Sequence, residues 1–572
     1  MDKRKKMVLT ASVIAGLLVV ALIIGAIYKY VAPSNVKREL NTVFELGENE
    51  VALIVDNVIR EEKGRKIDGQ TYVPAAVASA CMDERIYVDT KEKLLSYTTE
   101  GGLIQVTPGA VSYTLGREEK KAETVILSEQ EDGLYISLSF IAERASCYFQ
   151  EYEEPSRLVI MSDRAKTYTF AEMEDDTRVR TGPNKKYDYL TEVPEGERVI
   201  VDGTKPQENE YMAVTTLDGV SGYIPVDSVA KTEDAGWTFE RTPVSFTQKA
   251  LKEIVCLGWH QVTNEASSGV LSASVAQAPA MNVISPTWYA LSDNKGNFTS
   301  LANAGYVAQA HAAGLEVWAL VNDFADDINL NAVLGRTSSR TKLINALVAS
   351  AIQYDLDGIN IDFENVKAKN ADAYLEFLRE LVLRCHANDL VVSVDNYIPA
   401  EYNAFYNLEE QGRIVDYVIL MAYDEHYSGS EESGSVSSLP FVKNGLEATV
   451  AKVPKKRVIT ALPFYTRLWK EIKNKSGEIT LAPPTAYGMS GAESVIRANG
   501  ASPKWDDATG QYYAQFKADG ATYKIWLEEE TSLEKKLEVV MAQDVAGVAF
   551  WKLGFERAVT WKTIDEALKK SK

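Results

Sequence analysis

The segment with the clearest chemical potential runs from Asp357 to Glu364 and reads DGINIDFE. In a strand, side chains alternate between two faces, so Asn360, Asp362 and Glu364 share one face. The apolar residues between them occupy the other face, where they can pack against helices. Neighbouring carboxylates raise one another's pKa, which can keep one of them protonated near neutrality. The segment therefore predicts a general acid beside an ionised group that orients a ligand.

A structural role or a metal site is the alternative interpretation of this acidic strand. Buried acids are costly unless partners satisfy them, so stability alone is a poor reason for their presence. A divalent cation needs more converging oxygen ligands than the sequence assigns. The four cysteines lie far apart and are expected to be small core residues, namely Cys81, Cys147, Cys256 and Cys385. We expect neither a metal nor a cofactor.

Eight apolar segments between residue 243 and residue 572 are predicted strands, and helical stretches separate them. This alternation is typical of a (β/α)8 barrel, whose active sites lie at the C-terminal ends of the strands. The predicted strands are EIVCLGWHQV at 253, MNVISPTWYAL at 281, LEVWALVND at 315, LDGINIDFE at 356, LVVSVDNY at 390, VDYVILMAYD at 415, RVITALPFY at 457 and VAGVAFWKLGF at 545. The acidic segment ends the fourth strand and therefore faces the expected site.

The acidic segment resembles the DxxDxDxE signature of glycoside hydrolase family 18, the family of chitinases and cell-wall N-acetylglucosaminidases. The resemblance implies that Glu364 protonates the glycosidic oxygen and that Asp362 orients the substrate's acetamido group. In this family the substrate's own N-acetyl carbonyl is the nucleophile, so one acid and one helper suffice. The chain departs from the signature at Asn360, where the family has its second Asp. An Asn can hydrogen-bond Asp362 but cannot accept a shuttled proton.

Other strand ends carry residues that are similar to the same family. The sequence MAYD ends the sixth strand, and the resemblance implies that Tyr423 donates to the acetamido carbonyl while Asp424 holds a sugar hydroxyl. Trp551 ends the last strand and would form the floor on which a sugar face stacks. Asn396 and Tyr397, which follow the fifth strand, are expected sugar contacts. Asp357, the signature's first Asp, is expected to be structural.

Residues 470–540 are too long for a simple connection between the seventh and eighth strands. They read as three short strands followed by a helix, and they resemble the α+β insertion that deepens the cleft in some family members. The resemblance to family 18 thus covers residues 243–572. A deeper cleft favours binding along a polymer.

Residues 38–165 contain a weak internal repeat. The segment DGQTYVPAAVASACMDERIYVD is echoed by DGLYISLSFIAERASCYFQEYEE, and each copy reads as a turn, a strand, a short helix and another strand. This pattern resembles the copper amine oxidase N-terminal-like domains, an α+β scaffold or wall-binding module that lacks a copper site here. The repeat predicts an N-terminal α+β domain.

Residues 176–231 consist of short β-rich segments with turn residues between them. This spacing predicts a small β-barrel. The hairpin DGVSGYIP resembles bacterial Src homology 3-like domains, which often bind wall peptides. A rigid spacer with an ordinary turn is the alternative interpretation.

The N-terminus predicts a membrane anchor. A basic cytoplasmic segment, residues 1–6, precedes residues 7–28, which contain no charged residue, and about 20 apolar residues span a bilayer. The basic cluster should stay in the cytoplasm, which places the bulk of the chain outside the cell. A cleaved signal peptide is the alternative, but its apolar region would be shorter, roughly 7–15 residues.

The composition limits the classes of molecule that the chain can bind. The chain has 572 residues, 81 acidic and 61 basic, and a formal net charge of −20. Binding to nucleic acid needs a basic face, so we expect no nucleic-acid partner. We expect a membrane-anchored glycosidase that cleaves β-1,4 bonds at N-acetylglucosamine in peptidoglycan or a chitin-like glycan. A catalytically silent, lectin-like wall scaffold is the alternative, which Asn360 leaves open.

Overall fold

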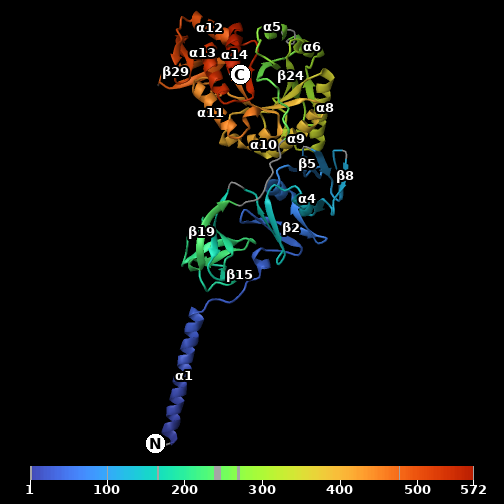
Figure 1. Cartoon of the computed structure of the whole chain (residues 1–572). Helices are drawn as coiled ribbons and strands as arrows, with labels where there is room; N and C mark the ends of the chain where they lie inside the picture. Colours follow the sequence, from blue (N-terminus) through green and yellow to red (C-terminus); the bar gives the residue numbers. More distant parts are fainter. Residues whose placement is uncertain are drawn as a thin grey trace. The chain divides into compact units, whose positions relative to one another are not determined.

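The computed structural model describes residues 3–99, 101–116, 118–163, 166–236, 246–266, 271–475 and 477–570 (Figure 1). It divides into two compact units. The first consists of Met1–Val88, Val106–Tyr113 and Lys120–Pro243, and the second of Asp89–Gln105, Thr114–Glu119 and Val244–Lys572. The second unit therefore takes in a segment, Asp89–Gln105, that the sequence places inside the predicted module 38–165.

Helix α1 (Lys3–Val31) contains the predicted anchor. Its stretch Met7–Gly25 has a mean hydropathy of 2.8 and none of it is buried against the protein. The helix is long and apolar enough to cross a membrane, and a signal sequence has the same properties. Retention of this helix as an anchor stays a prediction.

The first unit contains a seven-stranded sheet in the order β11, β12, β1, β2, β3, β10 and β9. Both copies of the internal repeat form a strand, a short helical segment and a second strand, as predicted. The elements are β1 (Glu50–Val55), β2 (Val58–Ile67), β3 (Gln70–Pro74), α3 (Ala75–Val77), η1 (Ala78–Met82), β4 (Ile86–Asp89), β9 (Leu127–Gln130), β10 (Gly133–Ser137), α4 (Leu138–Ala142), β11 (Tyr148–Tyr152) and β12 (Arg157–Met161).

A second seven-stranded sheet in this unit has the order β15, β14, β18, β17, β16, β13 and β19. It begins at Thr167, before the predicted boundary at 176. The two sheets share one hydrophobic core, in which Ile54 and Val159 of the first pack with Val199 and Val214 of the second. The strands are β13 (Thr167–Met173), β14 (Thr177–Arg180), β15 (Tyr189–Val193), β16 (Arg198–Val201), β17 (Tyr211–Thr216), β18 (Ser221–Pro225) and β19 (Val229–Gly236).

The turn of the DGVSGYIP hairpin is fixed against the first sheet. Arg157 on β12 donates its Nε to the carbonyl oxygen of Asp218 at 2.7 Å and pairs with the Asp218 carboxylate. Gly219 has a φ of +88°, which favours glycine, and an added Cβ would lie only 3.0 Å from Ile54. The two sheets are therefore joined by packing and an ion pair, and their resemblances to named modules stay predictions.

The second unit contains a closed barrel of eight parallel strands, and all eight predicted strands form it. Its strands follow the order β21, β20, β34, β28, β27, β26, β25 and β24, and a pairing of β21 with β24 closes the ring. The strands are β20 (Val255–His260), β21 (Val283–Pro286), β24 (Glu316–Asn322), β25 (Gly358–Asp362), β26 (Val391–Tyr397), β27 (Tyr417–Met421), β28 (Val458–Pro463) and β34 (Gly547–Trp551).

Helices surround this barrel. They are α5 (Leu271–Ala276), α6 (Ala304–Ala312), α8 (Thr337–Tyr354), α9 (Ala371–His386), α10 (Leu408–Ile414), α11 (Leu439–Val450), α13 (Glu530–Met541) and α14 (Ala558–Lys570). Buried side chains fill the interior, including Leu257, Trp318, Ile419 and Ala549.

At the entry of β25, the Asp357 carboxylate accepts a 2.7 Å hydrogen bond from the Val317 amide, so this residue is structural as expected.

The segment Asp89–Gln105 is integrated into the barrel unit. Helix α8 has no side-chain N-cap of its own, and the Asp89 and Glu92 carboxylates accept from the first backbone amides, those of Thr337 at 2.7 Å and Ser338 at 2.9 Å. Thr98 donates to the buried carboxylate of Glu376 on α9 at 2.7 Å. The barrel therefore depends on a piece of chain that precedes it by more than a hundred residues.

The insertion between β28 and the last barrel strand contains more elements than the three strands and one helix predicted for it. It forms a five-stranded sheet in the order β30, β29, β33, β32 and β31, and it includes a helix that the sequence interpretation lacked. The helix at 530–541, which was expected to belong to the insertion, is the barrel helix α13. The elements are β29 (Tyr465–Lys473), β30 (Ile479–Gly488), α12 (Met489–Ala498), β31 (Lys504–Asp506), β32 (Gln511–Ala518) and β33 (Ala521–Leu527).

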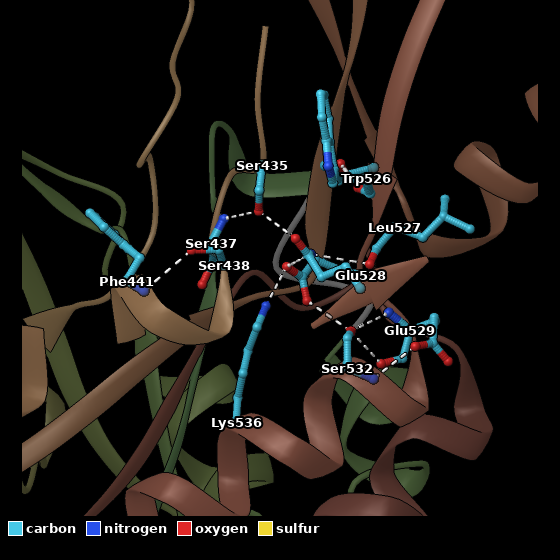
Figure 2. Close-up of polar contacts among 12 residues, drawn as sticks. Ser435, Ser437, Ser438, Phe441, Trp526, Leu527, Glu528, Glu529, Ser532 and Lys536 are labelled. Atoms are coloured by element: carbon cyan, nitrogen blue, oxygen red, sulfur yellow. Dashed lines mark hydrogen bonds and ion pairs between the residues drawn. The ribbon is translucent and has the colours of Figure 1, made fainter. Parts of the chain in front are cut away.

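A buried polar network joins this insertion to the barrel (Figure 2). Lys536 on α13 donates to the Glu528 carboxylate at 2.5 Å, and both side chains are almost fully buried. Gln511 donates to the same carboxylate at 2.7 Å and accepts from Ser435, which lies in the loop after β27. Burial raises the pKa of Glu528 to about 7, and Lys536 opposes that shift.

The cysteines meet the sequence expectation only in part. Cys256 and Cys385 are buried in the barrel unit, where burial raises the pKa of both thiols. Cys81 and Cys147 are half-buried. Cys81 lies in the last turn of η1 and Cys147 lies in the loop between α4 and β11, so neither reaches the core that the sequence analysis expected for them.

Replacement of Lys536 by Met is expected to destabilise the protein by about 3–5 kcal/mol at pH 8, because it leaves the Glu528 carboxylate buried without its partner. Urea unfolding measures the loss. The control is Lys535→Met on the same helix, an exposed lysine that should cost under about 1 kcal/mol. Equal stability of the two variants would contradict the assignment.

Candidate functional site

A pocket of about 200 Å³ opens at the carboxyl ends of the barrel strands. Side chains from β20, β24, β25, β26, β27 and β34 and from the insertion line it. The lining residues are Trp259, Leu320, Phe324, Asp362, Glu364, Asp395, Tyr397, Met421, Tyr423, Asp424, Tyr465 and Trp551. The location is the one expected for the active site of this fold.

Asn360 lies below the pocket at the centre of a hydrogen-bond network. Its Oδ1 accepts from Trp259 Nε1 at 3.0 Å and from Ser285 Oγ at 3.2 Å. Its Nδ2 donates to Ser393 Oγ at 3.1 Å and to Asp395 Oδ1 at 2.8 Å. Asn360 is fully buried and every hydrogen-bonding direction of its amide oxygen and nitrogen is used. It therefore supports the pocket floor and does not line the pocket.

Asp362 stands directly above Asn360 on the same face of β25. Its side chain is buried, and Oδ1 has no hydrogen-bond partner among the residues that the structure describes. Burial raises the pKa of Asp362 well above its usual range, and the negative charges of Asp395 and Glu364 add to the shift. The residue thus holds a proton more tightly than an ordinary Asp, and one of its oxygens has no hydrogen-bond partner among the described residues.

Glu364 lies just beyond the end of β25, where a turn directs it into the pocket. The Asp323 carboxylate holds this turn by accepting from the Glu364 amide at 3.0 Å and from the Asn365 amide at 3.0 Å. The Tyr397 hydroxyl donates to the Glu364 carboxylate. Burial raises the pKa of Glu364 and the charge of Asp323 adds to the rise, whereas the Tyr397 bond lowers it.

Tyr423 and Asp424 reach the pocket from the end of β27. The ring of Tyr423 meets Tyr465 of β29 edge-on, with 6.2 Å between their centroids. Asp424 accepts from Tyr465 Oη at 2.7 Å and pairs with Arg467 at 2.9 Å. The insertion strand β29 therefore holds the side chains of Tyr423 and Asp424 in position, so the α+β insertion is part of the site's support.

Trp551 covers one side of the pocket from the end of β34. Its ring lies 6.0 Å from that of Trp259, at an angle of 60°. An indole face in such a position offers apolar contact to a flat ligand while leaving polar groups free. Trp259 in turn is buried and donates to Asn360, so the aromatic and polar parts of the site support each other.

The structure brings most of the predicted residues together. Glu364, Asp362, Tyr423, Asp424 and Trp551 all line one pocket. Tyr397 lines it too, as expected for a ligand contact.

Asn396 does not reach the pocket. Its amide exchanges two hydrogen bonds with Gln411 of α10, at 2.7 and 3.2 Å, on the outer side of the barrel. Neighbouring residues of a strand point to opposite faces, so Asn396 and Tyr397 cannot both face the lumen. The expectation that both contact a sugar therefore fails for Asn396.

The sequence interpretation missed the pocket residues Asp395 and Tyr465, and it missed Asp323, which holds the turn of Glu364. Asp323 follows β24 in the segment VND, and an acid at a barrel strand's end was an available signal. Asp395 shares the inward face of β26 with Tyr397, so the period of two would have found it. Tyr465 belongs to the insertion, whose placement no local pattern indicates.

The pocket combines one accessible carboxyl with a raised pKa, a second buried carboxyl with a free oxygen, a tyrosine hydroxyl and an indole face. This set suits proton donation to a leaving oxygen on a flat ligand that carries an amide group. Within the residues described, three carboxyls of the pocket lining have environments that raise their pKa, namely Asp362, Glu364 and Asp395. Such groups are the common basis of acid and base roles.

Comparisons with known proteins agree with this chemistry. Residues 289–556 match the sequence model of the glycosyl hydrolases family 18. The chain is 25% identical over 305 residues to the uncharacterized glycosylase YvbX of Bacillus subtilis, covering 50% of this chain and 85% of that protein. It is 24% identical over 250 residues to the cortical fragment-lytic enzyme of Bacillus anthracis, covering 43% of this chain and 57% of that protein. Several of the curated relatives are thus matched over about half of their length.

The same barrel occurs among solved structures. The spore cortex-lytic enzyme SleL of Bacillus cereus superposes with a TM-score of 0.50 at 18% identity. The superposition covers 58% of this chain and 78% of that one. At 18% identity, the similarity shows only that this chain and SleL share a fold.

Proposed function

Because residues 289–556 form a domain of glycoside hydrolase family 18, we propose that the chain is a membrane-anchored enzyme that cleaves β-1,4 bonds at N-acetylglucosamine. The proposed substrate is peptidoglycan or a chitin-like glycan outside the cytoplasm. The observation that carries the proposal is the pair of carboxyls that line the pocket, in which Glu364 is partly exposed and Asp362 is buried with one oxygen that lacks a hydrogen-bond partner among the described residues. One relative is named a cortical fragment-lytic enzyme, and this name supports a cell-wall glycan as the substrate.

The proposed reaction retains configuration and uses the substrate's acetamido group. Glu364 donates its proton to the glycosidic oxygen while the acetamido carbonyl oxygen attacks the anomeric carbon and the glycosidic bond breaks. Asp362 accepts from the acetamido N–H with its free oxygen, and the Tyr423 hydroxyl donates to the carbonyl oxygen. Water then attacks the cyclic intermediate, and Glu364 takes up the proton of that water.

Raised carboxyl pKa values fit this scheme. The donor must be protonated when the substrate binds, and burial of Glu364 keeps it so toward neutral pH. Its ionised form after donation is stabilised by the Tyr397 hydroxyl. The same residue therefore acts first as an acid and then as a base.

Replacement of Glu364 by Gln removes the proton donor and keeps the shape of the side chain. We expect kcat on a chitooligosaccharide or a peptidoglycan glycan to fall roughly 10²- to 10⁴-fold. New reducing ends detected by mass spectrometry measure the change. The control is Glu447→Gln, an exposed glutamate on α11, which should keep wild-type turnover.

Wild-type turnover in E364Q would contradict the assignment of the acid. Glycan binding by the wild type without any new reducing ends would instead support the lectin-like alternative.

Replacement of Tyr397 by Phe removes the hydroxyl that lowers the pKa of Glu364. The pKa of Glu364 should therefore rise further, and its protonated form should persist to higher pH. We expect the alkaline limb of the kcat/KM profile to move to higher pH. Tyr402→Phe, at an exposed tyrosine of the following 3-10 segment Glu401–Tyr406, is the matched control. A limb that stays in place or moves to lower pH would contradict the role of Tyr397.

The anchor is tested by fractionation without detergent. The full-length protein should sediment with membranes because the apolar stretch Met7–Gly25 suits a bilayer core. A variant that lacks residues 1–35 should be released into the soluble fraction. Recovery of a soluble mature form that begins near residue 30 would show cleavage of a signal peptide instead.

A further inference from the structure

Asp395 is a buried acid of the pocket to which the reaction above gives no role. It lies on β26, is only 3% exposed and lines the pocket together with Asp362 and Glu364. Its Oδ1 accepts the 2.8 Å hydrogen bond from Asn360 Nδ2. A buried carboxyl without a cationic partner is expensive, so its presence in the pocket calls for a reason.

Strand register places this carboxyl beside Asp362. In the parallel pairing of β25 with β26, Asn360 is opposite Ser393, and both side chains face the lumen. Two residues further along each strand, the next pair of lumen-facing side chains is Asp362 and Asp395. The two acids therefore occupy one layer at the mouth of the barrel, directly above the Asn360 amide.

The orientation of the Asn360 amide follows from its neighbours. Trp259 Nε1 can only donate, so the atom that accepts from it at 3.0 Å is the amide oxygen. The amide nitrogen then faces Ser393 and Asp395, and it must donate to the Asp395 carboxylate. Asn360 thus cannot take a proton from Asp362, but it fixes the carboxyl of Asp395 next to it.

An acid at both positions would be unfavourable. With Asp at position 360, a carboxylate oxygen would replace the amide nitrogen that lies 2.8 Å from Asp395 Oδ1. Two carboxyl groups at this distance cannot both be ionised. An amide at 360 with an acid at 395 avoids this repulsion. Of the hydrogen-bonded pair Asn360 and Asp395, only the residue on β26 is therefore an acid.

The surroundings of Asp395 are acidic and phenolic. Burial raises its pKa well above the usual range and the charge of Glu364 adds to the rise, while the Asn360 bond opposes it. Arg467 of the insertion strand β29 pairs with Asp424. The titratable groups that interact with Asp395 are Asp362 and Glu364 from β25 and its turn, Tyr374 of α9 and Tyr423 after β27. Tyr397 of β26 and Asp424 after β27 line the same pocket.

We propose that Asp395 is the proton partner of Asp362, replacing from β26 the acid that the family signature carries at position 360. The inference rests on the proposed function, because it concerns the same reaction. One proton is shared between Asp362 and Asp395. After Glu364 has donated its proton and is ionised, the shared proton resides on Asp362 and faces Glu364. When Glu364 is protonated again, the shared proton returns toward Asp395. The proton moves within the pair and is not consumed, and Asp395 is a positioning residue that acts through Asp362.

Exchange of the two residues tests this proposal. The variant Asp395→Asn should lower kcat on the order of tenfold or more with little change in KM, and should alter the pH dependence of kcat. The double variant N360D/D395N restores one acid at this level, on β25, and should recover most of the lost kcat. The variant Asn360→Asp alone should not be more active than the wild type, because it adds a third acid to the pair.

The proposal is overturned if Asp395→Asn keeps the wild-type kcat and pH profile, or if the exchanged double variant is no more active than Asp395→Asn. A packing role for Asp395 would lower kcat equally in both variants, so recovery separates the two explanations. Circular dichroism and unfolding curves confirm that each variant is folded.

A second measurement does not depend on glycan turnover. An acid whose pKa is raised by folding contributes stability below its unfolded pKa and loses that contribution as pH rises through its folded pKa. The wild type should therefore lose more unfolding free energy between pH 4 and pH 8 than Asp395→Asn does. Identical slopes would overturn the shared proton. If the wild type cleaved no N-acetylated glycan, the proposed function would fail while this comparison still decided the inference.

Discussion

Crowding of carboxyl groups at the mouth of the barrel is the constraint on which the site depends. Asp362, Glu364 and Asp395 line one small pocket, and burial is the main cause of the raised pKa of each. Full ionisation of such a group is unfavourable, so the pocket retains protons that exposed acids would lose. Proton retention is also what general acid catalysis requires. The electrostatic cost of the arrangement and its chemical use therefore have the same origin.

The rest of the unit holds these groups in place. Asn360 and Trp259 fix the floor, Asp323 holds the turn that presents Glu364, and Tyr465 of the insertion holds Asp424. The insertion is attached in turn through the buried pair of Glu528 and Lys536. The contacts that hold Asn360, Glu364 and Asp424 join segments that lie far apart in the sequence, so the site depends on the complete fold of the unit.

The sequence predicted what local patterns encode. All eight barrel strands were found because each is an apolar segment between helical stretches, and the period of two placed Asp362 and Glu364 on one face. Asp323 and Asp395 had local signals, an acid at a strand end and the period of two, but their contacts with the Glu364 turn and with Asn360 come from neighbouring strands. The prediction that Asn396 contacts a sugar was wrong because the segment VDNY does not show which of its residues face the barrel lumen. The shared core of the two N-terminal sheets and the capping of α8 by Asp89 depend on long-range packing that no local pattern contains.

The central claim is that the substrate's acetamido group takes part in the reaction at a pocket whose acid is Glu364. The most direct measurement compares two oligosaccharides that differ only in the N-acetyl group of the sugar next to the cleaved bond. Mass spectrometry of the products should show cleavage of the N-acetylated oligosaccharide and none of its de-N-acetylated counterpart. Equal cleavage of the two would contradict the account, because Asp362 and Tyr423 would then have no acetamido group to orient.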